Sequence, residues 1–488
     1  MKKITYILTL LTLCCVISCE EIDRYPRGLQ STGTFFASET DALEALAGIY
    51  DNLQNWAFYT AKLDGMTNNS FERGMSNFGL VARLSHNPTS GPQSTIWNTA
   101  YKGVQRSNYL INNVDKIPSA PEVISILKAE GRLLRAYWYH VLVSYFGDVP
   151  YYTEQLTVEE LNNIERTPRA TVITNILDDL EAAIAVLPVN PGDTYRASKG
   201  AALGIKTRVQ LYEKNWSGVI EAYNAWNAIK DEAGYGLDAD YRNMFLAAGE
   251  NGPEAIFQVN FVGEGIDNLS QYHVPQVNWR DYREVQPLLS FILDHEVVGD
   301  TDPEDPFIGR DPRAAFNIAD EEVTDGTAIS ETGYMIRKMT EDVPRGTPYD
   351  QLKGDNIMLV RYSDMRMMFA EAENELNGPS AAVYDVIDEI RTRPTVGLPV
   401  IDRAVINNKD KLRDAIYSER KFEFAYEGLW YHDLKRRDDA YIKAQMSLVT
   451  EDNRLTSFES QGTDKYRLLP IPRNEMDINS SLSQNTGY

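Results

Sequence analysis

The chain has 488 residues, 43% hydrophobic and 24% charged, which is typical of a globular protein and excludes a disordered or fibrous one. Its 48 Lys and Arg against 71 Asp and Glu give a formal net charge of −23. This charge argues against nucleic-acid binding, which needs a basic surface, and disfavours polyanionic ligands. All three cysteines lie within the first 19 residues, so the rest of the chain can hold no disulfide, cysteine zinc site or thiol nucleophile.

The N-terminus has the parts of an export signal. A positively charged start precedes the mostly apolar run 4–16, which is too short to span a bilayer as a helix. Residues 16–19, Val-Ile-Ser-Cys, form a loose lipoprotein cleavage motif. We therefore predict that residues 1–18 are a lipoprotein signal peptide and that Cys19 becomes the lipidated first residue. An ordinary signal peptide with incidental cysteines is the alternative.

Residues 19–37 are predicted to be an irregular tether, because they contain Pro26, Gly28 and Gly33. Removal of residues 1–18 takes away two lysines, so the mature net charge becomes 46 − 71 = −25. No later segment approaches 18 uninterrupted apolar residues, so we expect a soluble body tethered by lipid.

The first part of the body is predicted to be a helical scaffold. A helix begins near Ser38, where Ser38 to Asp41 resembles a capping box. Apolar residues at helical spacing then indicate further helices, whereas the polar, Gly- and Asn-rich stretch 57–95 is expected to be a loop. The expected later helices of this part are 97–114, 124–146, 168–187, 198–214 and 216–230.

The second part begins with a change of composition. Residues 231–360 are rich in Gly, Pro and Asp and carry short β-like runs at 255–262 and 334–339. Helices resume at 363–376, 381–392 and 411–426, and the segment 436–488 is expected to be irregular. The sequence therefore predicts one mainly α domain over residues 38–488, in which repeated helix hairpins of the TPR kind at 38–230 and 361–435 support a variable insert at 231–360.

Three acidic residues could supply glycosidase chemistry, which needs two carboxylates flanking a sugar bond. Glu419, Glu423 and Glu427 are spaced i, i+4 and i+8 and share a helix face with apolar residues. We favour structural ion pairs instead, because buried acids are usually paired and three acids on one helix leave no obvious gap for a substrate. The expected arginine partners are Arg361, Arg391, Arg393 and Arg420.

No metal or cofactor motif is evident. The five histidines are scattered without an HExxH pair, and no phosphate-binding loop or nucleophile elbow is present. An acidic stretch could hold calcium, but it lacks the Gly at the sixth loop position and the Glu at the twelfth, so a solvated loop is favoured. We predict no cofactor. The acidic residues are Asp300, Asp302, Glu304 and Asp305.

Aromatic and amide residues on irregular segments are the candidate ligand contacts. Aromatic faces pack on the C–H faces of sugar rings, and amide and guanidinium groups hydrogen-bond to hydroxyls. Trp279 is the best single candidate, although any one of these aromatics can instead belong to the core. The predicted ligand-binding set is Trp279, Tyr272, Tyr282 and Arg280 in the insert, with Arg73, Asn68, Asn69 and Phe78 in the first loop.

Several segments in this order resemble the RagB/SusD family of surface glycan-binding lipoproteins of Bacteroidetes. The most distinctive runs from Glu130 to Pro150, EGRLLRAYWYHVLVSYFGDVP, and another from Glu419 to Gly428, ERKFEFAYEG. The chain ends in Gln-Asn-Thr-Gly-Tyr at 484–488, where the family more often has Asn-Pro-Gly-Tyr. The resemblance implies TPR-like helix pairs, no catalysis and a SusC-like TonB-dependent transporter as partner. It fixes no ligand residues.

The leading hypothesis is a non-catalytic lipoprotein at the surface of the outer membrane. It would capture oligosaccharides or polysaccharides and deliver them to its SusC-like transporter. Three alternatives remain open at this point: a peptide-binding uptake protein of the same family, a surface glycoside hydrolase, and a purely structural scaffold that binds no small ligand.

Overall fold

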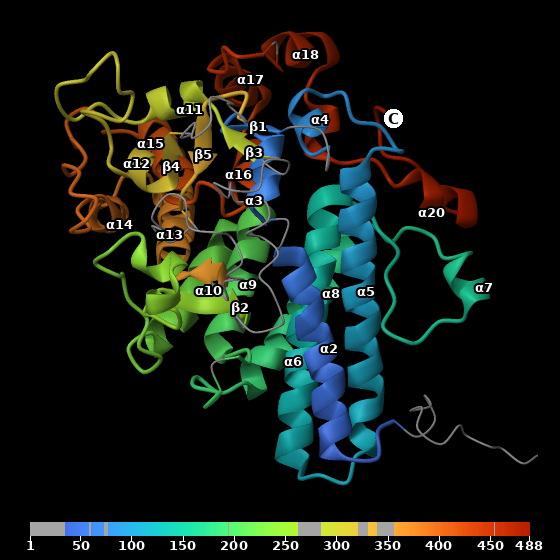
Figure 1. Ribbon diagram of the computed structural model, residues 1–488. Helices are drawn as coiled ribbons and strands as arrows, with labels where there is room; N and C mark the ends of the chain where they lie inside the picture. Colours follow the sequence, from blue (N-terminus) through green and yellow to red (C-terminus); the bar gives the residue numbers. More distant parts are fainter. Residues whose placement is uncertain are drawn as a thin grey trace, which may run out of the picture.

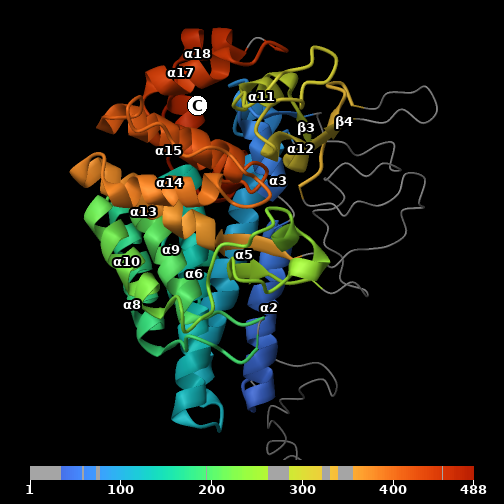
Figure 2. The same ribbon diagram turned by 90° about the vertical axis from the view of Figure 1, so that its left-hand side faces the viewer.

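Long helices form successive neighbouring pairs. A computed structural model describes residues 35–57, 60–72, 77–193, 195–261, 285–320, 330–338, 356–452 and 454–488. In it, the pairs are α2 (Glu39–Ala57) with α5 (Gly91–Asn113), α6 (Pro121–Phe146) with α8 (Arg169–Val186), α9 (Lys199–Tyr212) with α10 (Trp216–Ile229), and α13 (Tyr362–Asn377) with α14 (Ala381–Arg391) and α15 (Lys409–Glu423). The long helices from α2 to α13 pack against one another in chain order, and α14 and α15 both pack on α13 (Figures 1 and 2).

This arrangement confirms the predicted mainly helical class with few short strands. One large cluster of buried apolar side chains extends from Ala42 to Leu482 and packs between the helices from α2 to α13. A separate cluster, which includes Met367, Ile387 and Leu412, packs α14 and α15 against α13. Among the described residues, no helix combines the length and the apolar character needed to cross a membrane.

Local signals set the helix ends as the sequence indicated. The Ser38 hydroxyl accepts from the Asp41 backbone N–H, and the Asp41 carboxylate accepts from the Ser38 N–H at 2.8 Å, so the predicted capping box is present. Gly147 ends α6 with a φ of 73°, a conformation that suits glycine. A Cβ at Gly103 would lie 2.2 Å from the Trp138 ring, so glycine permits the close contact of α5 and α6.

Short antiparallel strand pairs lie within the insert or at its end, and one of them, β1 with β3, joins the insert to the first loop. In Figure 2 the strands β3 and β4 lie with α11 and α12 at one edge, away from the stack formed by α8 and α10. Strand β2 lies in the predicted strand 255–262 and β5 in 334–339. The pairs are β1 (Ser70–Glu72) with β3 (Val285–Pro287), β2 (Ala255–Val259) with β6 (Ile357–Arg361), and β4 (Ile318–Asp320) with β5 (Tyr334–Ile336). The helices of this part are α11 (Leu289–Asp294) and α12 (Arg313–Asn317), with 3₁₀ turns at Asn243–Phe245 and Ala247–Gly249.

Two segments expected to be irregular contain short elements. Within 57–95 the structure has α3 (Thr60–Leu63), a 3₁₀ turn (Asp64–Met66), β1 and α4 (Gly79–Ala82), and α5 starts six residues earlier than predicted. The expectation of an irregular segment at 436–488 is also wrong in large part. It contains α17 (Asp439–Ser447), α18 (Arg454–Gln461), α19 (Asp464–Arg467) and α20 (Arg473–Ile478), after α16 (Trp430–Arg436).

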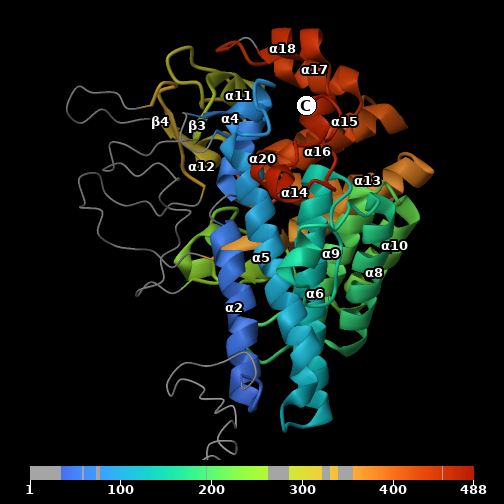
Figure 3. The same cartoon turned by 90° about the vertical axis from the view of Figure 1, so that its right-hand side faces the viewer.

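These tail helices are too short to show a clear period in sequence. They are held by buried side chains such as Phe458, Tyr466 and Leu482, which belong to the main core. Figure 3 shows α20 beside α5, so the C-terminal segment returns to the N-terminal helices. The remaining short elements are α7 (Val158–Leu161) and the 3₁₀ turn Val114–Lys116.

Candidate functional site

One short sheet connects the two segments from which ligand contacts were predicted. Strand β1 pairs with β3 so that Glu72 lies opposite Val285. Arg73 follows Glu72 in the chain, and Tyr282 precedes Val285 by three residues. The first loop and the insert are therefore attached to the body at the same end of the same sheet.

Most of the predicted contacts lie outside the described residues. Arg73 lies outside the described residues, as does the lipidation candidate Cys19. The same is true of the four predicted contacts in the insert, so their roles stay predictions. These four are Tyr272, Trp279, Arg280 and Tyr282.

The other three predicted contacts are buried in the body. Asn68 is 2% exposed, Asn69 0% and Phe78 1%. The side-chain oxygen of Asn68 accepts from the Trp430 indole N–H at 2.8 Å, and its amide N–H donates to the backbone oxygen of Gln445 at 3.2 Å. In this conformation the three side chains position the loop, and a direct contact with ligand stays a prediction.

Arg454, which holds the first loop in place, was not predicted from the sequence. Arg454 is 1% exposed and donates to the backbone oxygens of Thr67 and, at 2.8 Å, of Ser70. The Leu288 N–H also donates to the Asn69 backbone oxygen, which extends the contact between β1 and β3. No local signal marked Arg454, because it lies in the tail, more than 380 residues from its partners.

A buried acid lies at the base of the same loop. Asp64 accepts from the Asn69 side-chain amide at 3.2 Å and from the Gly428 backbone N–H at 3.3 Å. Burial raises the pKa of Asp64 to about 7, and these hydrogen bonds only partly oppose the rise. The turn at Tyr426, with a φ of 64°, is thus fastened to the first loop.

The three acids considered for glycosidase chemistry are paired, as predicted. Glu423 binds Arg361 and Arg393 at 2.9 and 3.0 Å and Arg313 at 3.2 Å. Burial alone would raise the pKa of Glu423, but the charges of Arg393, Arg361 and Arg313 outweigh it and hold this pKa well below its usual range. Such a carboxylate stays ionised and is a poor proton donor.

The two neighbouring acids are also occupied. Glu419 binds Arg313 at 2.6 Å and Arg391 at 3.2 Å. Glu427 binds Lys338 at 2.6 Å and Arg361 at 2.9 Å. Lys338 and Arg313, which come from the insert, were not among the predicted partners.

Arg420, the fourth predicted partner, binds other acids. Its guanidinium contacts Asp364 at 3.1 Å and Asp433 at 2.8 Å. The reason is helix geometry, because Arg420 directly follows Glu419 and therefore faces a different side of α15.

The acidic stretch considered for calcium is a surface loop. Asp300, Asp302 and Glu304 are exposed, and Asp302 accepts from the backbone N–H of Glu304 at 2.9 Å. Across the described ranges, no group of three or more His, Cys, Asp or Glu side chains is arranged to hold a metal ion.

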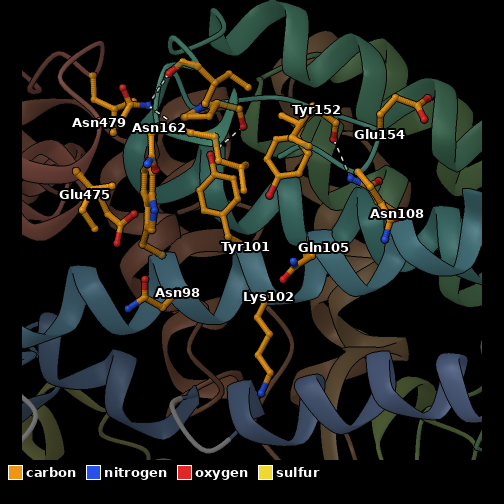
Figure 4. A pocket seen from close by; sticks show the side chains of 18 residues that line it. Asn98, Tyr101, Lys102, Gln105, Asn108, Tyr152, Glu154, Asn162, Glu475 and Asn479 are labelled. Carbon is orange, nitrogen blue, oxygen red and sulfur yellow. Dashed lines mark hydrogen bonds between the residues drawn. The ribbon is translucent and has the colours of Figure 1, made fainter. Parts of the chain in front are cut away.

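Two cavities of ligand size lie between described residues. One, of about 500 Å³, is mainly apolar and lies between α2 and the segment 258–261, which directly precedes the insert residues 262–284. The other, of about 480 Å³, lies between α5, α7 and α20 and has a mixed lining of polar, aromatic and aliphatic side chains (Figure 4). Both volumes fall in the range of about 300–1,000 Å³ that is usual for ligand pockets.

Two family models match opposite ends of this chain. The model of the SusD family matches residues 287–488. A second model, described as starch-binding associating with outer membrane, matches residues 28–211. Residues 212–286, which include the first part of the insert, lie between the two matches.

Curated relatives match along nearly the whole length. SusD-like protein P25 of Formosa agariphila is 27% identical, covering 96% of this chain and 97% of its own. SusD-like protein P2 of the same organism is 26% identical, covering 100% and 99%.

Solved structures share the fold. A SusD-like carbohydrate-binding protein of Bacteroides fragilis superposes with a TM-score of 0.79 at 23% identity, covering 92% of this chain and 100% of that one. A laminarin-binding SusD-like protein gives a TM-score of 0.70 at 24% identity, covering 93% and 100%. The surface glycan-binding protein A of Bacteroides fluxus gives 0.68 at 22%, covering 93% and 100%.

Proposed function

The chain belongs to the SusD-like family, and from this premise we propose that it is a non-catalytic glycan-binding protein of the cell surface. It captures oligosaccharides or polysaccharides and delivers them to a SusC-like TonB-dependent transporter. The observation that carries the proposal is the agreement along the whole chain with a family whose solved members include laminarin-binding and surface glycan-binding proteins.

The ligand site is proposed at the junction of the first loop and the insert. The pairing of Glu72 with Val285 attaches both segments to one rigid sheet end, and binding residues concentrate on loops held by a rigid scaffold. The aromatic rings of Trp279, Tyr272 and Tyr282 would stack on sugar rings. The side chains of Arg73 and Arg280 would hydrogen-bond to the sugar hydroxyls. The proposed site retains five of the contacts predicted from sequence, while Asn68, Asn69 and Phe78 are buried beneath the loop.

The absence of catalysis is proposed from the state of the acids. Glycoside hydrolysis needs one carboxylic acid that can donate a proton and a second carboxylate across the sugar bond. Glu419, Glu423 and Glu427 instead neutralise buried arginines and a lysine. A family model described as associating with the outer membrane supports the proposed location, where Cys19 would carry the lipid anchor.

The test is glycan binding by calorimetry on the mature, unlipidated protein. A panel of soluble glycans, including laminarin and starch fragments, identifies a ligand, and the Trp279→Ala variant is then compared with wild type. We expect affinity to fall at least tenfold in Trp279→Ala, because stacking on an aromatic ring is lost, and to be largely kept in Trp279→Phe.

Equal affinity in Trp279→Ala would remove this residue from the site. Binding of peptides but of no glycan would favour the peptide-uptake alternative instead. Release of reducing sugar from a bound glycan, abolished in a folded Glu423→Gln variant, would contradict the non-catalytic proposal.

A further inference from the structure

The cavity between α5, α7 and α20, here called the α5–α20 cavity, is distinct from the site proposed above. Its walls come from α5, the segment 150–164 and the segment 475–482. None of the contacts predicted from sequence lines it. Figure 1 shows α7 and α20 on one side of α5, at the edge of the helical stack.

One wall of the α5–α20 cavity is a row of polar side chains with free hydrogen-bonding groups. Asn98, Lys102 and Gln105 follow the spacing i, i+4 and i+7 on α5, so they share one exposed helix face. Within the described chain, none of the three has a hydrogen-bond partner. Figure 4 shows Asn98 and Gln105 on the side of α5 that carries Tyr101, whereas the Lys102 side chain extends away from Tyr101 and Tyr152. Together they offer two amides and an ammonium group.

A second wall is aromatic and already fixed in place. The rings of Tyr101 and Tyr152 have centroids 6.2 Å apart and planes within 6° of parallel. The Tyr101 hydroxyl donates to the backbone oxygen of Pro150 at 2.8 Å, and the Asn108 side-chain amide donates to the backbone oxygen of Tyr152 at 3.0 Å. This wall needs little reordering to receive a ligand, which lowers the entropic cost of binding.

The charges of the cavity disfavour an anionic ligand. Glu154 is exposed at the rim, and Glu475 is half-buried on α20. Burial raises the pKa of Glu475, and a hydrogen bond from Trp97 opposes the rise. The residues that line the cavity thus include two carboxylates and one cation, Lys102, so negative charge predominates. The carboxylates and side-chain amides also supply several hydrogen-bond acceptors.

We propose that the α5–α20 cavity is a second binding site that takes a short neutral saccharide. A sugar ring lies on the Tyr101 and Tyr152 wall, since aromatic faces pack on the C–H faces of sugars. Asn98 and Gln105 hydrogen-bond to its hydroxyls. Amides suit hydroxyl groups because each amide both donates and accepts. The volume of about 480 Å³ suits a few sugar rings rather than a long polymer.

The test uses ligand-observed NMR and calorimetry with three neutral trisaccharides, namely maltotriose, laminaritriose and mannotriose. Measurements are made in the Trp279→Ala background, so that the cavity is observed apart from the site proposed in the insert. The variant is Asn98→Ala with Gln105→Ala, and the matched control is Gln461→Ala, an exposed glutamine at the end of α18. Both changed residues are exposed, so thermal unfolding should stay unchanged.

We expect at least one trisaccharide to bind in the Trp279→Ala background. Its affinity should fall tenfold or more in the double variant and less than twofold in Gln461→Ala. Loss of all trisaccharide binding in Trp279→Ala alone would overturn the second site while leaving the proposed function intact. Unchanged affinity in the double variant, or no binding of any of the three probes, would also overturn it.

Discussion

The buried carboxyl group of Asp64 should make the stability of the fold depend on pH. The pKa of Asp64 is raised by burial to about 7, against about 3.9 in an unfolded chain. Because the folded state favours the protonated form, its stabilising contribution is fully present below about pH 4. That contribution is lost as the pH rises through 7.

The Asp64→Asn variant should therefore have a flatter stability profile. Between pH 5 and 7 we expect the wild-type free energy of unfolding to fall by about 2–3 kcal/mol more than that of Asp64→Asn. Urea unfolding at several pH values measures this slope. The exposed Asp300→Asn is the control and should keep the wild-type slope. Equal slopes in all three proteins would show that Asp64 ionises normally.

At the scale of elements, the α7 segment depends on a few tertiary hydrogen bonds. No residue of α7 is buried, so its own packing contributes little. The Asn479 amide on the C-terminal side of α20 donates to the backbone oxygens of Leu161 and Ile164, at 3.3 and 2.8 Å. Arg166 holds the far end through the oxygens of Asp148 and Ser483.

Asn479→Ala should loosen this wall of the α5–α20 cavity. Each lost hydrogen bond costs about 1 kcal/mol, which is a large share of the stability of a segment without a buried side chain. Hydrogen exchange measured by mass spectrometry should be at least fivefold faster at 157–165 and nearly unchanged in α6. Asn474→Ala, an exposed change on α20, is the control. Unaltered exchange at 157–165 would mean that other contacts hold the segment.

At the scale of the whole molecule, a buried ion cluster joins the insert to the second helical part, 361–435. In this cluster, five acidic side chains form ion pairs with five basic side chains. Arg313 comes from α12 in the insert, Arg361 from the end of β6, and Glu423 from α15. The acids are Glu254, Asp311, Glu419, Glu423 and Glu427, and the cations are Arg313, Lys338, Arg361, Arg391 and Arg393.

Removing one member should destabilise the whole fold. Glu423→Gln leaves Arg313, Arg361 and Arg393 with less charge compensation in a site closed to water. We expect the free energy of unfolding to fall by about 3–5 kcal/mol. Denaturant unfolding measures the change, with the exposed Glu44→Gln on α2 as control, expected within about 0.5 kcal/mol of wild type. A loss below about 1 kcal/mol would show that Glu423 is not essential to the cluster.

Features that depend on near neighbours in the chain were accessible from the sequence. The long helices α6, α8 and α13 repeat apolar residues every three to four positions, and the capping box at Ser38 lies within four residues. That Glu423 pairs with arginines was also expected from its place on an apolar helix face, because a buried acid needs a counter-charge. Which of the expected arginines it pairs with was not predicted. The signal peptide at residues 1–18 and the lipidation of Cys19 stay predictions, and they likewise rest on neighbouring residues in the chain.

Other features were decided only by tertiary contacts. The pairing of Glu72 with Val285, the clamp by Arg454 and the wall formed by α5 with α20 each join residues more than 200 positions apart. The short tail helices exist because Phe458 and Tyr466 enter the common core, and Arg420 faces Asp433 because of its angle on α15. Periodicity and capping act over a few residues, whereas these contacts depend on how distant surfaces pack. The sequence by itself thus determined the long helices and the need for counter-charges on their buried face. The tertiary structure decided the short tail helices, where the loops meet and where cavities remain.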